Sequence, residues 1–260
     1  MQLETRVHSC LAAGRPAFGS TAMLTSAEAV ELIACHANLD WMMFEMQHLA
    51  LDVLQVVHRL RALQAADPTI TPFARLPSRD HVWIEQTLDA GFTGLIIPQI
   101  ESAEQARAIA SAGHYPPTGS RSWAGSVRAL TIYDNYQAGI DEHLILLPQI
   151  ESVAGLENCE AIINEPGIHG VLLGPGDLSL SHGWPMNDMW SRTPFREAVK
   201  RVADACIAAG KVAATLMTGD DAKRAIDAGY RMIGVSGDAV VIRSSMATSI
   251  NAEIASLHDS

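Results

Sequence analysis

Positive charge is scarce in this chain of 260 residues. The sequence has 18 Lys and Arg residues against 29 Asp and Glu residues, which gives a formal net charge of −11. Such a surface repels both nucleic acid and anionic membranes, so we expect neither as a partner. A local basic pocket for a small anion is still compatible with this composition, because net charge does not describe a single site.

Cysteines and long apolar runs are also scarce. The four cysteines are far apart in the sequence and show no CxxC spacing, which argues against a disulfide framework. No apolar run reaches the ~18 residues of a membrane span. Residues 1–19 lack a basic segment followed by a long apolar core, so we expect no signal peptide. Together these absences predict free thiols and a cytoplasmic location.

Short apolar runs alternate with amphipathic stretches along the chain. The runs are apolar on both faces and bounded by Gly, Pro or polar residues, which is typical of buried parallel strands. Eight runs of this kind are present, at 17–24, 40–47, 69–76, 94–100, 144–150, 169–176, 211–217 and 230–237. Helical patterns, many of them starting at Ser or Thr and ending at Gly, lie between them at 26–37, 51–66, 79–91, 102–113, 152–163, 193–210 and 218–229.

This alternation predicts a fold of the α/β class, a single (β/α)8 TIM barrel domain over residues 1–260. An open doubly wound sheet is the alternative, but it usually has a glycine-rich phosphate loop after its first strand, and FGSTAML lacks that pattern. Residues 113–142 do not fit the alternation. We expect them to form an insertion on a βα loop, at the end of the barrel where active sites lie.

Polar side chains gather where the predicted strands end. In a parallel barrel these ends meet at one rim, so acids, an arginine and an imidazole should converge there. The residues concerned are Glu45, Gln47, His48, Arg75, Gln99, Glu101, Gln149, Glu151 and Asp177. Glu45 lies three residues before His48, so its carboxylate is placed to orient the imidazole as a general base. Arg75 is either a surface ion-pair residue or, if it points inward after so apolar a strand, a residue that needs an anion as its partner.

Glu151 and Asp177 are the candidate metal ligands. Two carboxylates from neighbouring strands suit Mg²⁺ or Mn²⁺, with Co²⁺ or Zn²⁺ as second choices, and leave positions open for a 2-oxo acid. The alternative is that both carboxylates cap helices. A metal ion there would polarise the ketone of the 2-oxo acid and stabilise its enolate. An enolate can also form through a Schiff base with lysine. That route is disfavoured because the three lysines, Lys200, Lys211 and Lys223, fall in helices or at the start of a strand.

PQIES occurs twice, at 98–102 and at 148–152, each time where a strand gives way to a helix. Three explanations remain open: chance, residue preferences that strand–turn–helix junctions share, and an old gene duplication.

The chain resembles the class II pyruvate-dependent aldolases of the HpcH/HpaI aldolase/citrate lyase family, which includes aldolases for 4-hydroxy-2-oxoheptanedioate and for 2-keto-3-deoxy sugar acids. The likeness runs over roughly residues 15–250. GPGDLS within 170–179 is its most specific piece. The other pieces are DWMMFEMQH at 40–48, the strand end at Arg75, YPPTGSR at 115–121 and the second PQIES.

The resemblance implies a (β/α)8 barrel, often a hexamer that exchanges its last helix between subunits. It implies Glu151 and Asp177 as metal ligands, His48 as general base and Arg75 as the residue that holds the pyruvyl oxygens. Asp89 would reach across a subunit interface towards the histidine. The substrate would be lined by Gln149, Gly174, Pro175, Gly176, Asp177, Trp123 and Leu216.

This chain departs from the family pattern near the site. The family usually has Asp-x-Glu-His where residues 45–48 read Glu-Met-Gln-His, and Arg-Gly-x-Gly where residues 121–124 read Arg-Ser-Trp-Ala. These changes bear on the acceptor aldehyde and leave the metal–enolate core intact.

The expected function is therefore divalent-metal-dependent, reversible cleavage of a 4-hydroxy-2-oxo acid to pyruvate, or a close 2-oxo acid, and an aldehyde, by a homo-oligomer. A CoA-ester lyase, an oxaloacetate-decarboxylating relative and a non-catalytic small-molecule binder are the alternatives.

Overall fold

Eight parallel strands close into a barrel in the computed structural model, which describes residues 1–49 and 52–258. Each strand pairs with its neighbours in sequence, and β8 pairs with β1 to complete the ring. The strands are β1 Ala17–Ala22, β2 Trp41–Glu45, β3 Thr71–Arg75, β4 Gly94–Ile97, β5 Ile145–Ile150, β6 Gly170–Leu173, β7 Val212–Leu216 and β8 Met232–Gly237. All eight predicted strands are confirmed, and the TIM barrel is the observed fold.

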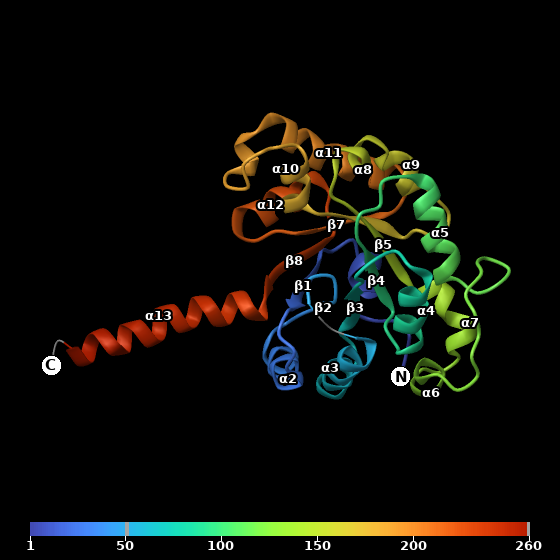
Figure 1. The fold of residues 1–260 in the computed structure, drawn as a ribbon, viewed down its shortest axis with the longest axis horizontal. Helices are drawn as coiled ribbons and strands as arrows, with labels where there is room; N and C mark the ends of the chain where they lie inside the picture. Colours follow the sequence, from blue (N-terminus) through green and yellow to red (C-terminus); the bar gives the residue numbers. More distant parts are fainter. Residues whose placement is uncertain (50–51, 259–260) are drawn as a thin grey trace.

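Helices surround the barrel between consecutive strands (Figure 1). Those predicted from the sequence are α2 Ala27–His36, α3 Val53–Ala66, α4 His81–Asp89, α5 Ala103–Gly113, α11 Thr193–Ala208 and α12 Gly219–Ala228, and the stretch 152–163 divides into α8 Val153–Glu157 and α9 Cys159–Asn164. Residue 51, where one helix was expected to begin, lies outside the described residues. The sequence did not predict α1 Arg6–Ala12, α6 Arg128–Ile132, α7 Tyr136–His143, α10 Pro175–Ser181 and the short 3-10 helix η1 Met189–Ser191.

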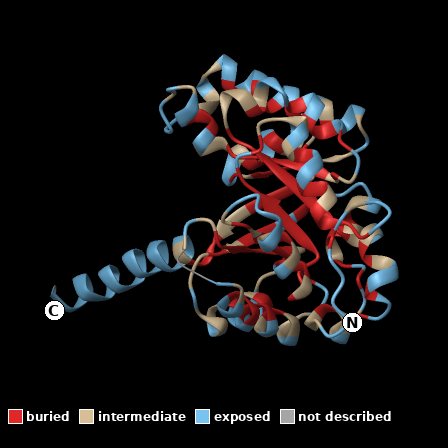
Figure 2. Cartoon of the chain, turned by 45° about the vertical axis from the view of Figure 1, so that its right-hand side comes forward, coloured by how far each residue is buried: buried red, intermediate tan, exposed pale blue. Residues whose placement is uncertain are grey.

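Two apolar clusters stabilise the barrel. One lies inside the ring of strands, where Trp41, Met43 and Phe73 pack together and α1 contributes Val7. The other lies between the strands and the surrounding helices, and the strands are buried on both faces (Figure 2). A Cβ atom on Gly19 would overlap the Trp41 ring, so the close packing of β1 on β2 requires glycine at this position.

The insertion lies at the opposite end of the barrel from the one that we expected. It follows α5 and contains α6 and α7, so it connects a helix to β5. Because α5 runs antiparallel to the strands, a segment that follows it begins at the amino-terminal ends of the strands. The predicted βα placement of residues 113–142 is therefore wrong: helix 102–113 had already carried the chain away from the active rim.

The last helix, α13, projects from the barrel (Figure 1). It spans Asp238–His258 and begins directly after β8. Its side chains are exposed along almost its whole length (Figure 2), including Met246, Ile250 and Ile254. Within the described ranges, none of the helices combines the length and apolar character that crossing a bilayer needs.

Candidate active site

Glu45 and Arg75 form a buried ion pair at the ends of β2 and β3. Arg75 donates from Nε, at 2.7 Å, and from Nη2 to the same oxygen of Glu45, Oε2. The other oxygen, Oε1, accepts from the backbone nitrogens of Gln47 and His48, at 2.6 and 3.2 Å. Glu45 is fully buried and the Arg75 side chain is 12% exposed, so water and salt screen this pair only weakly. The carboxylate that we expected to orient the imidazole instead holds Arg75 and the backbone of the β2–α3 turn.

Gln149 and Glu151 extend the polar rim at the end of β5. The Gln149 amide donates to Glu151 Oε2, and the backbone nitrogen of Gln99 donates to Glu151 Oε1 at 2.9 Å. Gln149 is 1% exposed, and its Oε1 has no hydrogen-bond partner among the described residues. A buried amide oxygen without a partner is costly, so this atom is available to a ligand or an ordered water.

The junction between β6 and α10 lies close to the Glu151 side chain. A Cβ atom on Gly174 would lie 3.0 Å from Glu151 Cβ and 3.1 Å from Gln149 Nε2, so only glycine fits here without displacing these side chains. Pro175 is in the first turn of α10, and Asp177 follows with an exposed carboxylate. Helix capping does not explain the two acids: Ser152 caps α8 and Gly174 is at the N-cap position of α10.

Charges at the rim act on one another. Burial raises the pKa of Glu151, and the negative charge of Asp177 raises it further, while hydrogen bonds from Gln99 and Gln149 and the charge of Arg75 oppose the rise. A cation between the two carboxylates would offset both the burial and the repulsion.

The rim fits a hard metal ion held by few protein ligands. No group of three or more His, Cys, Asp or Glu side chains in the described part of the chain is arranged to hold a metal. Mg²⁺ commonly binds one or two carboxylates and completes its shell with water and substrate oxygens. Glu151 and Asp177, beside the unpartnered Gln149 oxygen, match that donor set.

His48 and Leu216 lie at the same end of the barrel, after β2 and at the end of β7. The His48 side chain is exposed, and its backbone is held by Glu45. Leu216 and Arg75 line a hollow of about 350 Å³ at the mouth.

Asp89 and Trp123 lie at the opposite end. Asp89 is the last residue of α4, and its Oδ1 accepts from Arg121 Nη2 at 2.7 Å. Arg121 is buried, stacks over Tyr115 and belongs to the insertion, as does Trp123, which is 57% exposed. The placement of Trp123 at the active rim of its own chain is wrong, because the insertion is an αβ connection. Asp89 is also remote from the His48 of its own barrel, and its expected approach to His48 across a subunit interface stays a prediction.

The lysines take no part in the rim. Lys211 donates to the carbonyl oxygens of Ile163 and Glu165, at 2.6 and 2.8 Å, beside the start of β7. Lys200 and Lys223 form exposed ion pairs on α11 and α12. The geometry thus agrees with the exclusion of a Schiff-base route.

Comparison with known proteins shows the family of this chain. The HpcH/HpaI aldolase/citrate lyase profile matches residues 23–244, which span both halves of the rim. The chain belongs to the HpcH/HpaI aldolase/citrate lyase family. It is 39% identical over 193 residues to the 2-keto-3-deoxy-L-rhamnonate aldolase of Salmonella typhimurium (strain LT2), an alignment that covers 71% of this chain and 68% of that enzyme.

Solved structures agree with the family. A family member from Burkholderia cenocepacia J2315 superposes with a TM-score of 0.84 at 29% identity, covering 92% of this chain and 94% of that one. Macrophomate synthase superposes with a TM-score of 0.83 at 25% identity, covering 98% and 90%. The predicted family, the barrel and a carbon–carbon lyase of the aldolase type are confirmed. Enzymes of this family depend on a divalent metal ion, which confirms the metal requirement in general form.

Two features of the rim had no signal in the sequence. Gln99 adopts a left-handed backbone conformation, with φ of 56°, that turns its N–H towards Glu151. The pairing of Glu45 with Arg75 depends on the register of β2 and β3, which places the two residues side by side.

Proposed function

We propose that this enzyme reversibly cleaves a 4-hydroxy-2-oxo acid to pyruvate, or a close 2-oxo acid, and an aldehyde. The observation that supports this most is the convergence of Glu151, Asp177 and Arg75 on one rim of the barrel, where β5, β6 and β3 end. Two acids and one arginine fit a metal ion and an anionic substrate together. The rhamnonate aldolase relative acts on a 2-keto acid by its name, which supports the same substrate class.

Each residue of the rim has a role in this proposal. Glu151 and Asp177 would hold Mg²⁺ or, equally, Mn²⁺, with Co²⁺ or Zn²⁺ as second choices. When bound, the metal would supply a Lewis acid that draws electron density from the 2-oxo group. The backbone of residues 174–176 would form the wall beside the substrate carboxylate, and the unpartnered Gln149 oxygen would accept a hydrogen bond from an ordered water.

Arg75 would stabilise the negative charge that develops on the substrate, and His48 would transfer the proton. In the cleavage direction His48 accepts the proton of the 4-hydroxyl group, the C3–C4 bond breaks, and its electron pair forms the enolate of pyruvate. Arg75 donates hydrogen bonds to the oxygen on which negative charge develops, while Glu45 fixes the guanidinium. Protonated His48 then returns the proton to C3, directly or through a water molecule, which completes pyruvate; the reverse sequence, in which His48 removes a methyl proton, forms the bond.

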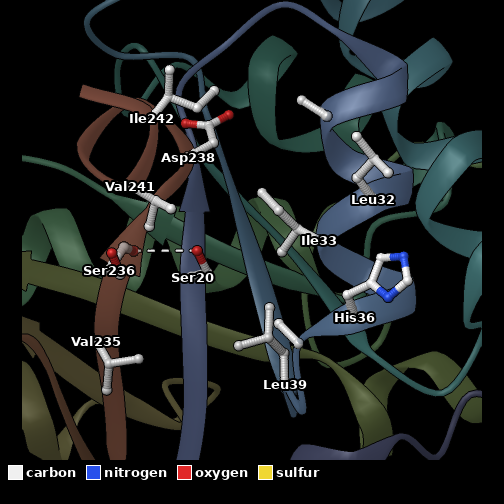
Figure 3. Close-up of a pocket in the computed structure, with 12 residues that line it drawn as sticks. Ser20, Leu32, Ile33, His36, Leu39, Val235, Ser236, Asp238, Val241 and Ile242 are labelled. Atoms are coloured by element: carbon white, nitrogen blue, oxygen red, sulfur yellow. Dashed lines mark hydrogen bonds between the residues drawn. The ribbon is translucent and has the colours of Figure 1, made fainter. Parts of the chain in front are cut away.

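A homo-oligomer, with a hexamer as the specific prediction, is the assembly that we propose. α13 leaves the outer face of β1 and β8 uncovered, and a groove of about 540 Å³ lies there against α2. Leu32, Ile33 and Val241 point into this groove (Figure 3). An exposed helix with Met246, Ile250 and Ile254 is the kind of segment that would fill the groove of a second copy. In that assembly the partner subunit's Asp89 would approach the rim, with its insertion loop and Trp123 close by.

A cytoplasmic location also remains a prediction. The four cysteines are free, and Cys35 is exposed, which fits a reducing compartment.

Proton exchange at the methyl group of pyruvate tests the chemistry without any knowledge of the aldehyde. Enzyme, pyruvate and Mg²⁺ or Mn²⁺ are incubated in heavy water, and loss of the methyl signal is followed by proton NMR. We expect exchange by the wild-type enzyme. We also expect that His48→Ala slows it by ~10²–10⁴-fold, as for a lost general base.

The PQIES motif, which occurs twice in the chain, provides a matched control. Glu151→Gln should abolish exchange at ordinary metal concentrations. Glu101→Gln should retain it, because Glu101 accepts a hydrogen bond from Ser152 at 2.6 Å and has no role at the metal site. If the folded, metal-loaded wild-type protein shows no exchange above the buffer rate, the enolate mechanism is wrong, and the CoA-ester lyase and binder alternatives gain support.

A further inference from the structure

The hollow that contains Leu216 and Arg75 lies on the side of the barrel mouth away from Glu151. Its residues come from β1, β2, β3, β7, β8 and the first turn of α13, whereas Glu151 follows β5. The hollow has a volume of about 350 Å³. Because Arg75 forms part of its wall, a molecule in it would lie next to the pyruvyl oxygens that Arg75 would hold in the proposed reaction.

The wall of this hollow is mainly apolar. Met23, Met43, Leu216 and Val240 line it, and among the described residues of the wall Arg75 alone has an ionisable side chain. The charge of Arg75 is already matched by Glu45. A Cβ atom on Gly234 would overlap Leu216 Cδ2, so the glycine allows Leu216 to lie flat against β8. The remaining polar groups of the wall are the hydroxyls of Thr21, Thr218 and Ser236.

A buried carboxylate fixes the wall in place. Asp238 is 2% exposed, and its two oxygens accept from the backbone nitrogens of Met23 and Leu24, at 2.8 and 2.9 Å. Asp238 also begins α13, two residues before Val240. The loop after β1 and the first turn of α13 are thereby held together, and Met23 and Val240 stay on the hollow.

We propose that this hollow is the acceptor pocket, which holds the carbon chain of the aldehyde, and that the preferred aldehyde is uncharged and aliphatic beyond its carbonyl group. The proposal rests on the aldolase function proposed above. On entering this pocket, the hydroxyl groups of a polyhydroxylated aldehyde would lose their hydrogen bonds to water. The methionine, leucine and valine side chains cannot replace those hydrogen bonds. A second carboxylate would find no cation among the described residues of this wall beyond the already paired Arg75.

A series of aldehydes tests this with pyruvate as the donor. From acetaldehyde to pentanal, we expect kcat/KM for bond formation to rise about fourfold per added methylene until the pocket is full. Glyceraldehyde should react more slowly than propanal, and succinic semialdehyde more slowly than butanal. Faster reaction of either polar aldehyde than of its aliphatic counterpart would overturn the proposal.

Two matched valine variants assign the preference to the pocket. Val240→Thr exchanges a methyl for a hydroxyl at a half-exposed position of the wall, so the ratio of kcat/KM for pentanal to that for acetaldehyde should fall about fourfold. Val82→Thr makes the same change on α4, outside the pocket, and should leave the ratio unchanged. An equal ratio in both variants and the wild type would show that Val240 does not contact the acceptor chain, and the proposal would be wrong.

Proton exchange on pyruvate in heavy water distinguishes failure of the acceptor-pocket proposal from failure of the proposed aldolase function. Exchange without an aliphatic preference refutes the acceptor pocket alone. Absence of exchange refutes the aldolase function, and the acceptor pocket with it.

Discussion

Replacing Gly174 with alanine would place a methyl group against the proposed metal ligand. The new Cβ would lie 3.0 Å from Glu151 Cβ and 3.1 Å from both Glu151 Oε2 and Gln149 Nε2. Non-bonded carbon atoms prefer roughly 3.5–4.0 Å, so the overlap between the two Cβ atoms is about half an ångström. Gly174 has φ of −91°, which alanine adopts without strain. The overlap must therefore be relieved by moving the Glu151 and Gln149 side chains.

The expected cost has two parts. Overpacking of a tight site typically costs ~1–3 kcal/mol of unfolding free energy, which for a chain of this size lowers Tm by roughly 2–12 °C. Misplacing a catalytic group by up to about 1 Å costs ~10²-fold in rate. We expect Gly174→Ala to fold, to bind Mg²⁺ or Mn²⁺ at least ~10-fold more weakly, and to lose ~10²-fold in pyruvate exchange.

Gly139→Ala is the matched control. Its Cβ would also meet a neighbour at 3.0 Å, the Leu3 Cδ1 atom, but at the opposite end of the barrel on α7. Thermal unfolding by circular dichroism, metal titration calorimetry and heavy-water exchange are measured for both variants. Wild-type metal affinity and exchange in Gly174→Ala would refute the close approach of Gly174 to a functional Glu151.

Three further outcomes follow from the structure. Glu45→Gln should cost ~3–5 kcal/mol in denaturant unfolding because it leaves Arg75 without its buried partner, and an unchanged midpoint would show that the pair contributes nothing. Burial lowers the pKa of His169 from 6.5 to about 4, so the unfolded chain binds a proton that the folded one excludes, and stability is lost as pH falls from 6.5 to 4. His169→Asn, which can still accept a hydrogen bond from the Leu146 N–H, should remove about 3 kcal/mol of this pH dependence. If the free energy of unfolding depends on pH in the variant as it does in the wild type, His169 is not the source. Gln99→Gly should be more stable than Gln99→Ala by ~1 kcal/mol in the same assay, because only glycine adopts φ of 56° freely, and equal stability would argue against strain there.

The sequence by itself determined the barrel and most of its active rim. Buried parallel strands are local, continuous apolar runs, so all eight were visible without tertiary information. In a closed parallel sheet the carboxyl ends share one edge, so placing Arg75, Gln149 and Glu151 after strands already placed them together. The alternation of the elements was enough for this step.

Tertiary structure decided which atoms meet. Glu45 could be expected near His48 from their spacing, but strand register turned its carboxylate to Arg75 instead. The direction of α5, which is set by packing against the barrel, put Trp123 at the far end. The acceptor pocket joins Met23, Leu216 and Val240 from segments about 200 and 25 residues apart in the chain. Local sequence patterns predict the periodicity and burial of each element. Contacts of this kind depend instead on strand register, on the path of the loops and on the anchoring of α13 by Asp238. These three features exist only in the folded chain.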